Sequence, residues 1–89
     1  MLEVHYTKKF LKELKLAKKR GKKLKNLEVI MEKLAYGYTL EKKYCDHGLI
    51  GNFAGRRECH IEYDWLLIYK IEGTCITFER IGTHADLFN

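Results

Sequence analysis

The 89-residue chain contains 46% apolar and 33% charged residues, a composition typical of one small globular domain and one that excludes a disordered chain. It has no proline and no low-complexity tract, so we expect a single domain over residues 1–89. The longest apolar run, residues 65–69, is far shorter than the ~20 residues that span a bilayer. Charged residues stand where a signal peptide would have its apolar segment, which predicts a cytoplasmic protein.

The net charge of +5 is distributed unevenly along the chain. Ten of the seventeen Lys and Arg residues lie between Lys8 and Lys25, whereas the second half of the chain is acidic. A dense run of one sign favours a polyanionic partner over a merely solvated helix face. Nucleic acid, an acidic protein and an anionic membrane surface all fit this observation.

The first half of the chain reads as one strand followed by two helices. Residues 2–6 alternate apolar and polar side chains, as a half-buried strand does. Thr7 can cap a helix that begins at Lys8 and ends near Gly21, with lysines along its outer face. A second amphipathic helix is expected from about 23 to 36. Because the link between the helices is very short, we expect an antiparallel helical hairpin.

After Leu40 the pattern changes to short β-branched and aromatic segments separated by glycines. Residues 66–69 are apolar on both faces, which predicts a central strand, and residues 83–88 are expected to form a short helical turn. The sequence therefore predicts an α+β domain, with the helical hairpin packed on one face of an antiparallel sheet. The expected strands of the second half are 49–53, 56–62, 65–71 and 74–80.

The three cysteines, Cys45, Cys59 and Cys75, are odd in number, widely spaced and without a CxxC pair. This spacing argues against a disulfide framework and against a zinc knuckle. We expect all three to behave as small hydrophobic residues.

Polar residues of the second half include three of the four histidines. Glu58, His60 and Glu62 fall on one face of an extended strand, and such a charged face either meets solvent or lines a cleft. Each residue taken singly has a structural explanation: a solvated histidine, a turn aspartate, a core tryptophan at 65, an apolar plug at 88. Their concentration in half of a small chain is more informative, and the candidate set is His47, His60, Asp64, Arg80 and His84.

Two chemistries suit this set. Histidine titrates near neutral pH, so two imidazoles can act as base and acid when a ribose 2′-hydroxyl attacks the neighbouring phosphate, and a cation can stabilise the phosphate charge. The alternative is a metal site, for which His60 and Asp64 are the nearest pair in sequence. Since no HxH or HxxxH pair occurs, the sequence favours chemistry without a metal.

Four motifs occur in order at residues 44–49 (YCDHGL), 57–62 (RECHIE), 64–70 (DWLLIYK) and 80–88 (RIGTHADLF). Together with the basic helical hairpin before them, they resemble the YafQ branch of the RelE/ParE toxin superfamily over nearly the whole chain. One departure is Tyr63, where a proline often precedes the aspartate in this branch. It affects the turn and leaves the catalytic inventory intact.

The resemblance implies a RelE-like fold and the toxin of a type II toxin–antitoxin system. Such a toxin enters the ribosomal A site and cuts messenger RNA there, without metal or cofactor. A cognate acidic antitoxin blocks it and binds operator DNA together with it, and no membrane is involved. A non-catalytic RNA- or protein-binding member of the fold is the alternative.

The resemblance also assigns roles to individual residues. It gives the catalytic roles to His47, His60, Asp64 and His84. It gives supporting or RNA-binding roles to Glu58, Trp65, Arg80 and Phe88, and it implies that the lysine-rich hairpin grips ribosomal RNA, with Lys18, Lys19, Lys22 and Lys23 as the test residues.

Overall fold

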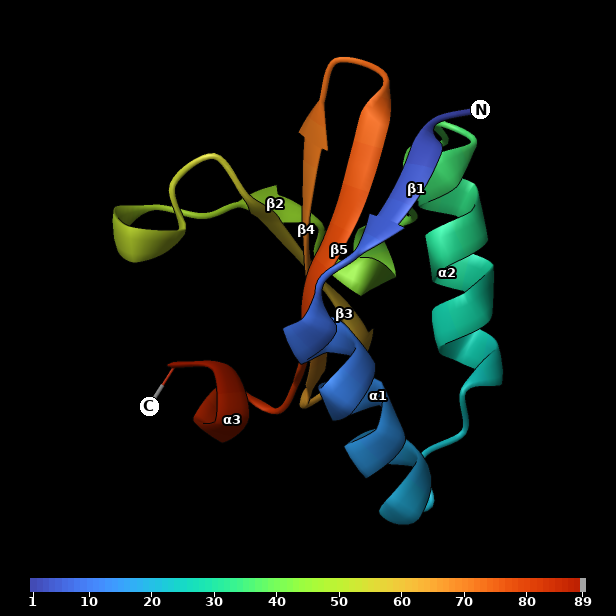
Figure 1. Ribbon diagram of the computed structural model, residues 1–89, viewed down its shortest axis with the longest axis vertical. Helices are drawn as coiled ribbons and strands as arrows, with labels where there is room; N and C mark the ends of the chain where they lie inside the picture. The colour runs from blue at the N-terminus through green and yellow to red at the C-terminus, as the bar shows by residue number, and fades with distance from the viewer. Residues whose placement is uncertain (89) are drawn as a thin grey trace.

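The computed structural model describes residues 1–88 of the chain (Figure 1). Within these residues three helices and five strands form, joined in part by two short 3₁₀ turns. In chain order the elements are β1 (Glu3–Tyr6), α1 (Lys8–Lys19), α2 (Lys25–Ala35), η1 (Lys42–Tyr44), β2 (His47–Gly48), η2 (Gly51–Phe53), β3 (Arg57–Glu62), β4 (Trp65–Glu72), β5 (Cys75–Gly82) and α3 (His84–Phe88).

The five strands form one sheet in the order β1-β5-β4-β3-β2. Neighbouring strands from β2 to β5 are antiparallel, but β1 pairs with β5 in parallel, from Glu3 opposite Cys75 to Tyr6 opposite Phe78. The expectation of a purely antiparallel sheet is therefore wrong at this one edge. A parallel pair needs a long connection, and here the rest of the domain separates the two strands.

The two long helices lie on one face of the sheet and run in opposite directions (Figure 1), as the sequence predicts. Thr7 caps α1, since its hydroxyl oxygen accepts a hydrogen bond from the backbone N–H of Phe10 at 2.9 Å. The second helix begins at Lys25, two residues later than expected, and no side chain of the described residues caps it. The main core lies between helices and sheet and includes Phe10, Ala17, Leu27, Ile30, Leu34, Leu67, Tyr69, Ile76 and Phe78.

The side of β5 that β1 leaves uncovered is closed by groups from Thr7 and α1. Beyond Tyr6, the hydroxyl of Thr7 donates to the carbonyl of Glu79 at 2.7 Å. The carboxylate of Glu13 in α1 accepts the backbone N–H of Ile81 at 3.1 Å. Side chains thus replace the ladder hydrogen bonds that a longer β1 would supply.

The central strand β4 is buried on both faces, as its apolar run predicts. Leu66 and Ile68 face away from the main core and pack with Leu87 of α3. Leu49 and Phe53, which are partly buried, complete this second, smaller core. Since α3 has only five residues, its position depends on Leu87 more than on its own helical hydrogen bonds.

Two sequence expectations fail in the loops. Residues 49–53 form no strand: β2 covers only His47–Gly48, and Gly51 takes a φ of +67°, a left-handed conformation that starts the η2 turn instead. Only Cys59 is a fully buried cysteine, and burial raises the pKa of its thiol to about 12. Cys45 is exposed and Cys75 is half-buried, and within residues 1–88 all three are free. No helix in this part of the chain is long and apolar enough to cross a membrane.

The second core predicts the effect of truncating Leu87. Leu87→Ala should lower the free energy of unfolding by about 2–4 kcal/mol, because it removes a buried leucine and leaves a cavity against Leu66 and Ile68. Urea denaturation measures this change. The matched control is Leu11→Ala on the exposed side of α1, which should change stability by less than about 0.5 kcal/mol. Equal effects of the two substitutions would contradict the second core.

Candidate active site

The site is centred on Glu58 of β3, whose carboxylate is buried with only 4% of the residue exposed. The β2–β3 register sets His47 directly opposite Glu58, and His60 lies two residues farther along the same face of β3. Oε1 of Glu58 is 3.5 Å from Nε2 of His47 and 3.3 Å from Nε2 of His60. A buried carboxylate requires polar partners, and these two imidazoles supply them.

The second half of the site joins Asp64, in the turn between β3 and β4, to His84 at the start of α3. Oδ1 of Asp64 accepts the backbone N–H of His84 at 2.9 Å and lies 2.7 Å from its ring Nδ1. These hydrogen bonds, the backbone one first, lower the pKa of Asp64 below its usual value. Because an ionised carboxylate only accepts hydrogen bonds, Nδ1 carries the proton. Nε2 is then the nitrogen that can exchange a proton with a substrate.

The two halves meet where the rings of His60 and His84 pack edge to face, with centroids 5.7 Å apart. We call His47, Glu58, His60, Asp64 and His84 the histidine cluster. Its members come from β2, β3, the β3–β4 turn and α3, and it adjoins the second core, because Glu58 and His60 lie opposite Ile68 and Leu66 of β4. The structure thus brings together all four residues predicted to be catalytic.

Phe88 extends the histidine cluster on the far side of His84. Its ring centroid is 6.2 Å from that of His84 and 5.5 Å from that of Phe53. Phe88 remains 43% exposed. A partly exposed aromatic ring beside an imidazole offers a surface on which a nucleobase can stack.

The position of α3 is set by its first turn. Asp86 accepts the backbone N–H of Thr83 at 3.0 Å, and the Thr83 hydroxyl accepts the N–H of Asp86 at 3.1 Å, a reciprocal cap. The cap lowers the pKa of Asp86, and Arg20 of the α1–α2 link pairs with the same carboxylate at 3.1 Å. Gly82 is required here, since a Cβ would lie 2.8 Å from Cβ of Asp86.

Two predicted supporting residues lie outside the histidine cluster. Arg80 makes a two-pronged ion pair with Glu13 of α1, through Nε at 3.0 Å and Nη2 at 2.8 Å, and this pairing raises its pKa. Trp65 is buried in the main core, with the ammonium of Lys22 5.3 Å from its ring centre. Glu13 was not anticipated from the sequence, although it is the only acidic residue within the lysine-rich helix.

A further unanticipated group fixes the loop that carries His47. The hydroxyl of Tyr69, on the core side of β4, donates to Oδ1 of Asp46 at 2.7 Å, and Nε of Arg57 donates to the same oxygen at 3.2 Å. Burial, together with this hydrogen bond, raises the pKa of Tyr69 above its usual range. The residue before His47 is therefore tied to the centre of the sheet.

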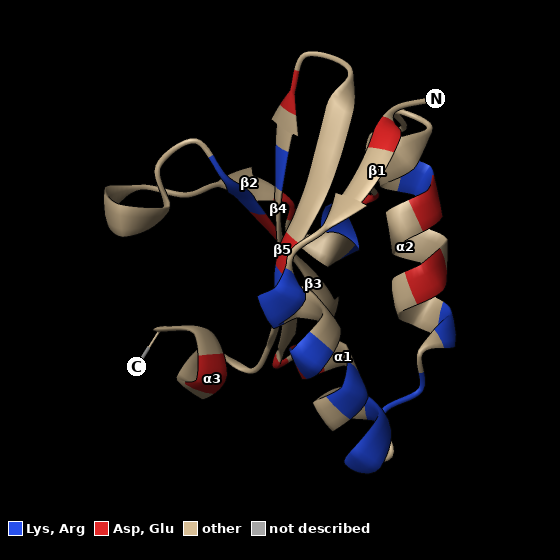
Figure 2. Cartoon of the chain, viewed as in Figure 1, with Lys and Arg blue, Asp and Glu red and all other residues tan. Residues whose placement is uncertain are grey.

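The basic residues gather along α1 and the α1–α2 link (Figure 2). Lys18, Lys19 and Lys23 are exposed, whereas Lys22 is half-buried and pairs with Glu62 at 3.2 Å. A groove lined by residues of both regions joins this basic end to the residues that precede and begin α3. Its lining includes Arg20, Lys22, Trp65, Thr83 and Asp86.

The histidine cluster also contains a set of possible metal ligands. His47, Glu58 and His60 each offer a ligand atom, and these atoms lie within 4.8 Å of one another. The sequence-based candidate pair, His60 with Asp64, is wrong in its partners, because Asp64 bonds to His84 and His60 faces Glu58.

Comparison with known proteins gives a consistent result. Residues 2–89 match the family described as the bacterial toxin of type II toxin–antitoxin system, YafQ. The chain is 41% identical over 87 residues to the mRNA interferase toxin YafQ of Escherichia coli strain K12, which covers 97% of this chain and 95% of that protein.

Solved structures agree with the sequence match. The fold matches the crystal structure of the E. coli DinJ–YafQ complex with a TM-score of 0.94 and 40% identity, over 100% of both chains. It also matches the crystal structure of a metal-bound toxin from Helicobacter pylori with a TM-score of 0.92 and 40% identity, over 99% of this chain and 100% of that one. The resemblance seen in the sequence motifs is thereby confirmed, and the chain belongs to the YafQ family of toxins of bacterial type II toxin–antitoxin systems.

Proposed function

We propose that this protein is the ribosome-dependent endoribonuclease of a toxin–antitoxin pair, and that it cleaves messenger RNA in the ribosomal A site without a metal. The observation that carries the proposal is the histidine cluster, in which three imidazoles and two carboxylates from four separate elements converge. The name of the E. coli relative, an mRNA interferase, supports the same activity.

The reaction requires proton transfer on opposite sides of one phosphorus atom. A neutral imidazole takes the proton of the 2′-hydroxyl as the 2′-oxygen bonds to phosphorus. An imidazolium gives its proton to the 5′-oxygen as the phosphorus–oxygen bond breaks. The products are a 2′,3′-cyclic phosphate and a 5′-hydroxyl. The two ends of the histidine cluster, His84 on one side and His60 with His47 on the other, supply the two nitrogens.

The carboxylates act through the imidazoles in this mechanism. Asp64 holds His84 with Nε2 available to the substrate, and Glu58 orients His47 and His60 and balances their charge when they are protonated. Phe88 stacks on a base beside the scissile bond. Arg80 reaches the phosphate only by exchanging Glu13 for it, and Trp65 supports the groove from beneath.

Metal-independence has a specific physical argument. A cation bound by His47, Glu58 and His60 would take up imidazole nitrogens that proton transfer needs. Metal at this set and acid–base catalysis by the same rings are therefore mutually exclusive. The H. pylori toxin is metal-bound in its crystal structure, and in this chain metal at the same rings would inhibit cleavage.

The partners follow from charge and family. The basic surface of α1 binds ribosomal RNA in the cytoplasm, and an acidic antitoxin covers both the helices and the site. The E. coli relative forms a complex with DinJ, which supports such a partner here. Operator DNA is bound only by the toxin together with its antitoxin.

One observation favours the alternative, a non-catalytic RNA- or protein-binding member of the fold. Arg80, the cation expected to stabilise the phosphate, is neutralised by Glu13. Messenger cleavage in a purified translation system distinguishes the two functions: binding to ribosomes without new messenger ends would leave only the alternative.

Substitutions in the histidine cluster test the chemistry. His84→Ala and His60→Ala should each lower the rate of messenger cleavage on ribosomes by about 10²–10⁴-fold, because each removes a proton-transfer group. Products should end in a 2′,3′-cyclic phosphate, and excess chelator should leave the rate unchanged. His5→Ala in β1 is the control and should cleave normally. A 3′-hydroxyl end, or loss of activity with chelator, would overturn the mechanism.

The pairing of Asp64 with His84 predicts a pH-dependent stability. Because the pKa of Asp64 is lowered in the folded state, its contribution is complete above the usual value of 3.8 and is lost as the pH falls through the folded pKa. The urea midpoint should therefore drop less between pH 7 and pH 3 for Asp64→Asn than for wild type. The variant should also cleave at least ~10²-fold more slowly. Ring nitrogen NMR shifts should reveal a changed His84 tautomer, which a purely structural role would leave unchanged.

The lysines are expected to act in binding. Changing Lys18, Lys19, Lys22 and Lys23 together to glutamine should weaken ribosome association and reduce its salt dependence by on the order of one log-log unit per lost phosphate contact. Sedimentation with ribosomes at several salt concentrations measures both. Binding of the antitoxin should be less affected. Unchanged ribosome binding at moderate salt would make the basic run a solvated face.

A further inference from the structure

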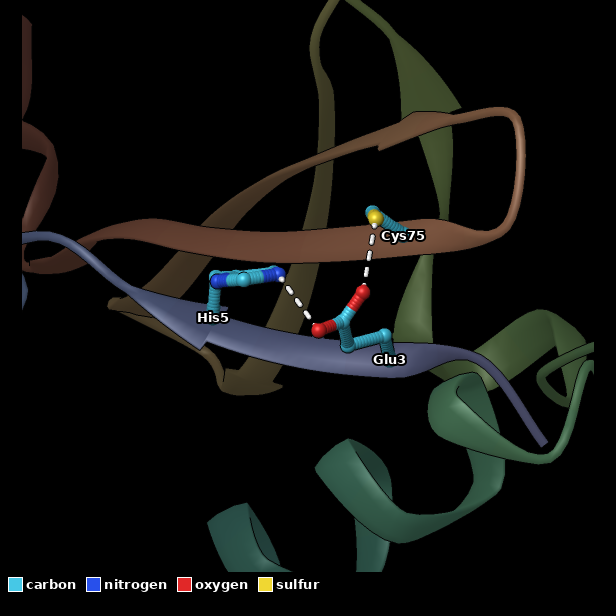
Figure 3. Close-up of side chains that lie close together, drawn as sticks. All are labelled: Glu3, His5 and Cys75. Atoms are coloured by element: carbon cyan, nitrogen blue, oxygen red, sulfur yellow. Dashed lines mark hydrogen bonds and ion pairs between the residues drawn. The ribbon is translucent and has the colours of Figure 1, made fainter.

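A second cluster of metal-binding side chains lies at the opposite edge of the sheet from the histidine cluster. Glu3 and His5 are two residues apart on β1, and Cys75 is the register partner of Glu3 on β5. Figure 3 shows the three side chains gathered on one face of the β1–β5 edge, turned toward one another. They lie on the side away from α2, because the alternate residue Val4 packs into the main core.

The spacing of these three groups suits a small cation. Sγ of Cys75 is 3.4 Å from Oε2 of Glu3, and Nε2 of His5 is 3.6 Å from Oε1 of the same carboxylate. All three ligand atoms lie within 4.8 Å of one another. Ligands of a tetrahedral zinc ion stand about 3.3–3.6 Å apart, from metal–ligand lengths of about 2.0–2.3 Å. The side chains are thus already close to a coordinating arrangement.

We propose that Glu3, His5 and Cys75 form a binding site for a divalent d-block cation of the zinc type, with a fourth position open to water. Thiolate, imidazole and carboxylate together favour Zn²⁺ over the hard cations Mg²⁺ and Ca²⁺, which take oxygen ligands. The carboxylate and the thiolate contribute two negative charges, which balance the cation.

Proton balance follows from the hydrogen bond of Cys75. The hydrogen bond to Glu3 raises the pKa of the thiol, so the metal-free site keeps its proton. On binding, the sulfur–hydrogen bond breaks, the sulfur–metal bond forms, and the proton passes to water. Glu72 lies opposite Cys75 on β4 and is paired with Lys70 at 3.3 Å, so the three ligands suffice without it.

The expected consequence is a clamp between two strands from opposite ends of the chain. β1 has four residues, and within the described part of the chain its ladder pairing is with β5 alone. A cation held by Glu3 and His5 on β1 and by Cys75 on β5 would tie this edge strand to the sheet. Because β1 and β2 are at opposite edges, this site and the proposed catalytic function fail independently of each other.

Cobalt titration tests the site directly, because Co²⁺ bound to a thiolate has a near-ultraviolet charge-transfer absorption that imidazole and carboxylate ligands lack. The full chain should develop this band and lose it when Zn²⁺ is added. The band should persist in Cys45→Ser, and in a His47→Ala/His60→Ala variant that lacks the other ligand set. It should vanish in Cys75→Ser and require at least roughly tenfold more cobalt in His5→Ala.

Thermal unfolding with Zn²⁺ supplies a second readout. Saturating Zn²⁺ should raise the Tm of the His47→Ala/His60→Ala variant by on the order of 10 °C, and adding Cys75→Ser should remove that rise. Circular dichroism verifies the folding of each variant, and His5→Ala provides an independent test should Cys75→Ser not fold. No cobalt–thiolate band in the wild type, or a band that survives in folded Cys75→Ser or is unchanged in His5→Ala, would overturn the proposal.

Discussion

Burial of β4 on both faces is the constraint on which the rest of the molecule depends. Leu67 and Tyr69 point into the core beneath the two long helices, while Leu66 and Ile68 point to the other side. Apolar surface on that second face must be covered, and the chain covers it with Leu87 of α3 and with the loop around η2. The short helix that begins with His84 is therefore docked by the hydrophobic effect, and the histidine cluster forms where this cover meets the sheet edge.

The histidine cluster shows how a requirement for stability can also prepare chemistry. Removing the Glu58 carboxylate from water costs several kcal/mol unless polar groups surround it. The β2–β3 register supplies His47, and the next position on the same face supplies His60. These imidazoles are held close together by the electrostatics of a buried charge. Asp64 performs the same service for His84 in a more exposed setting, with backbone and side-chain hydrogen bonds to one oxygen.

Sequence periodicity predicted the helices, the central strand and the terminal helical turn, because apolar spacing determines which side chains can share a core. It could not predict the parallel pairing of β1, since strand alternation indicates a buried face without indicating a partner. It also paired His60 with Asp64. A register irregularity after His60 and the tight turn before Trp65 instead carry Asp64 to α3. The Glu13–Arg80 contact joins residues 67 positions apart, a separation at which local patterns carry no information.

Closure of the β5 edge by side chains affects how the chain behaves among its own copies. An uncovered stretch of strand presents N–H and C=O groups that a strand of another molecule can pair with, which is a common route to aggregation. In this domain the Ile81 N–H is occupied by Glu13 and the Glu79 carbonyl by Thr7. A solvated, lysine-rich helix thus stands where a further strand could have added, and like charges on neighbouring molecules repel one another at this edge.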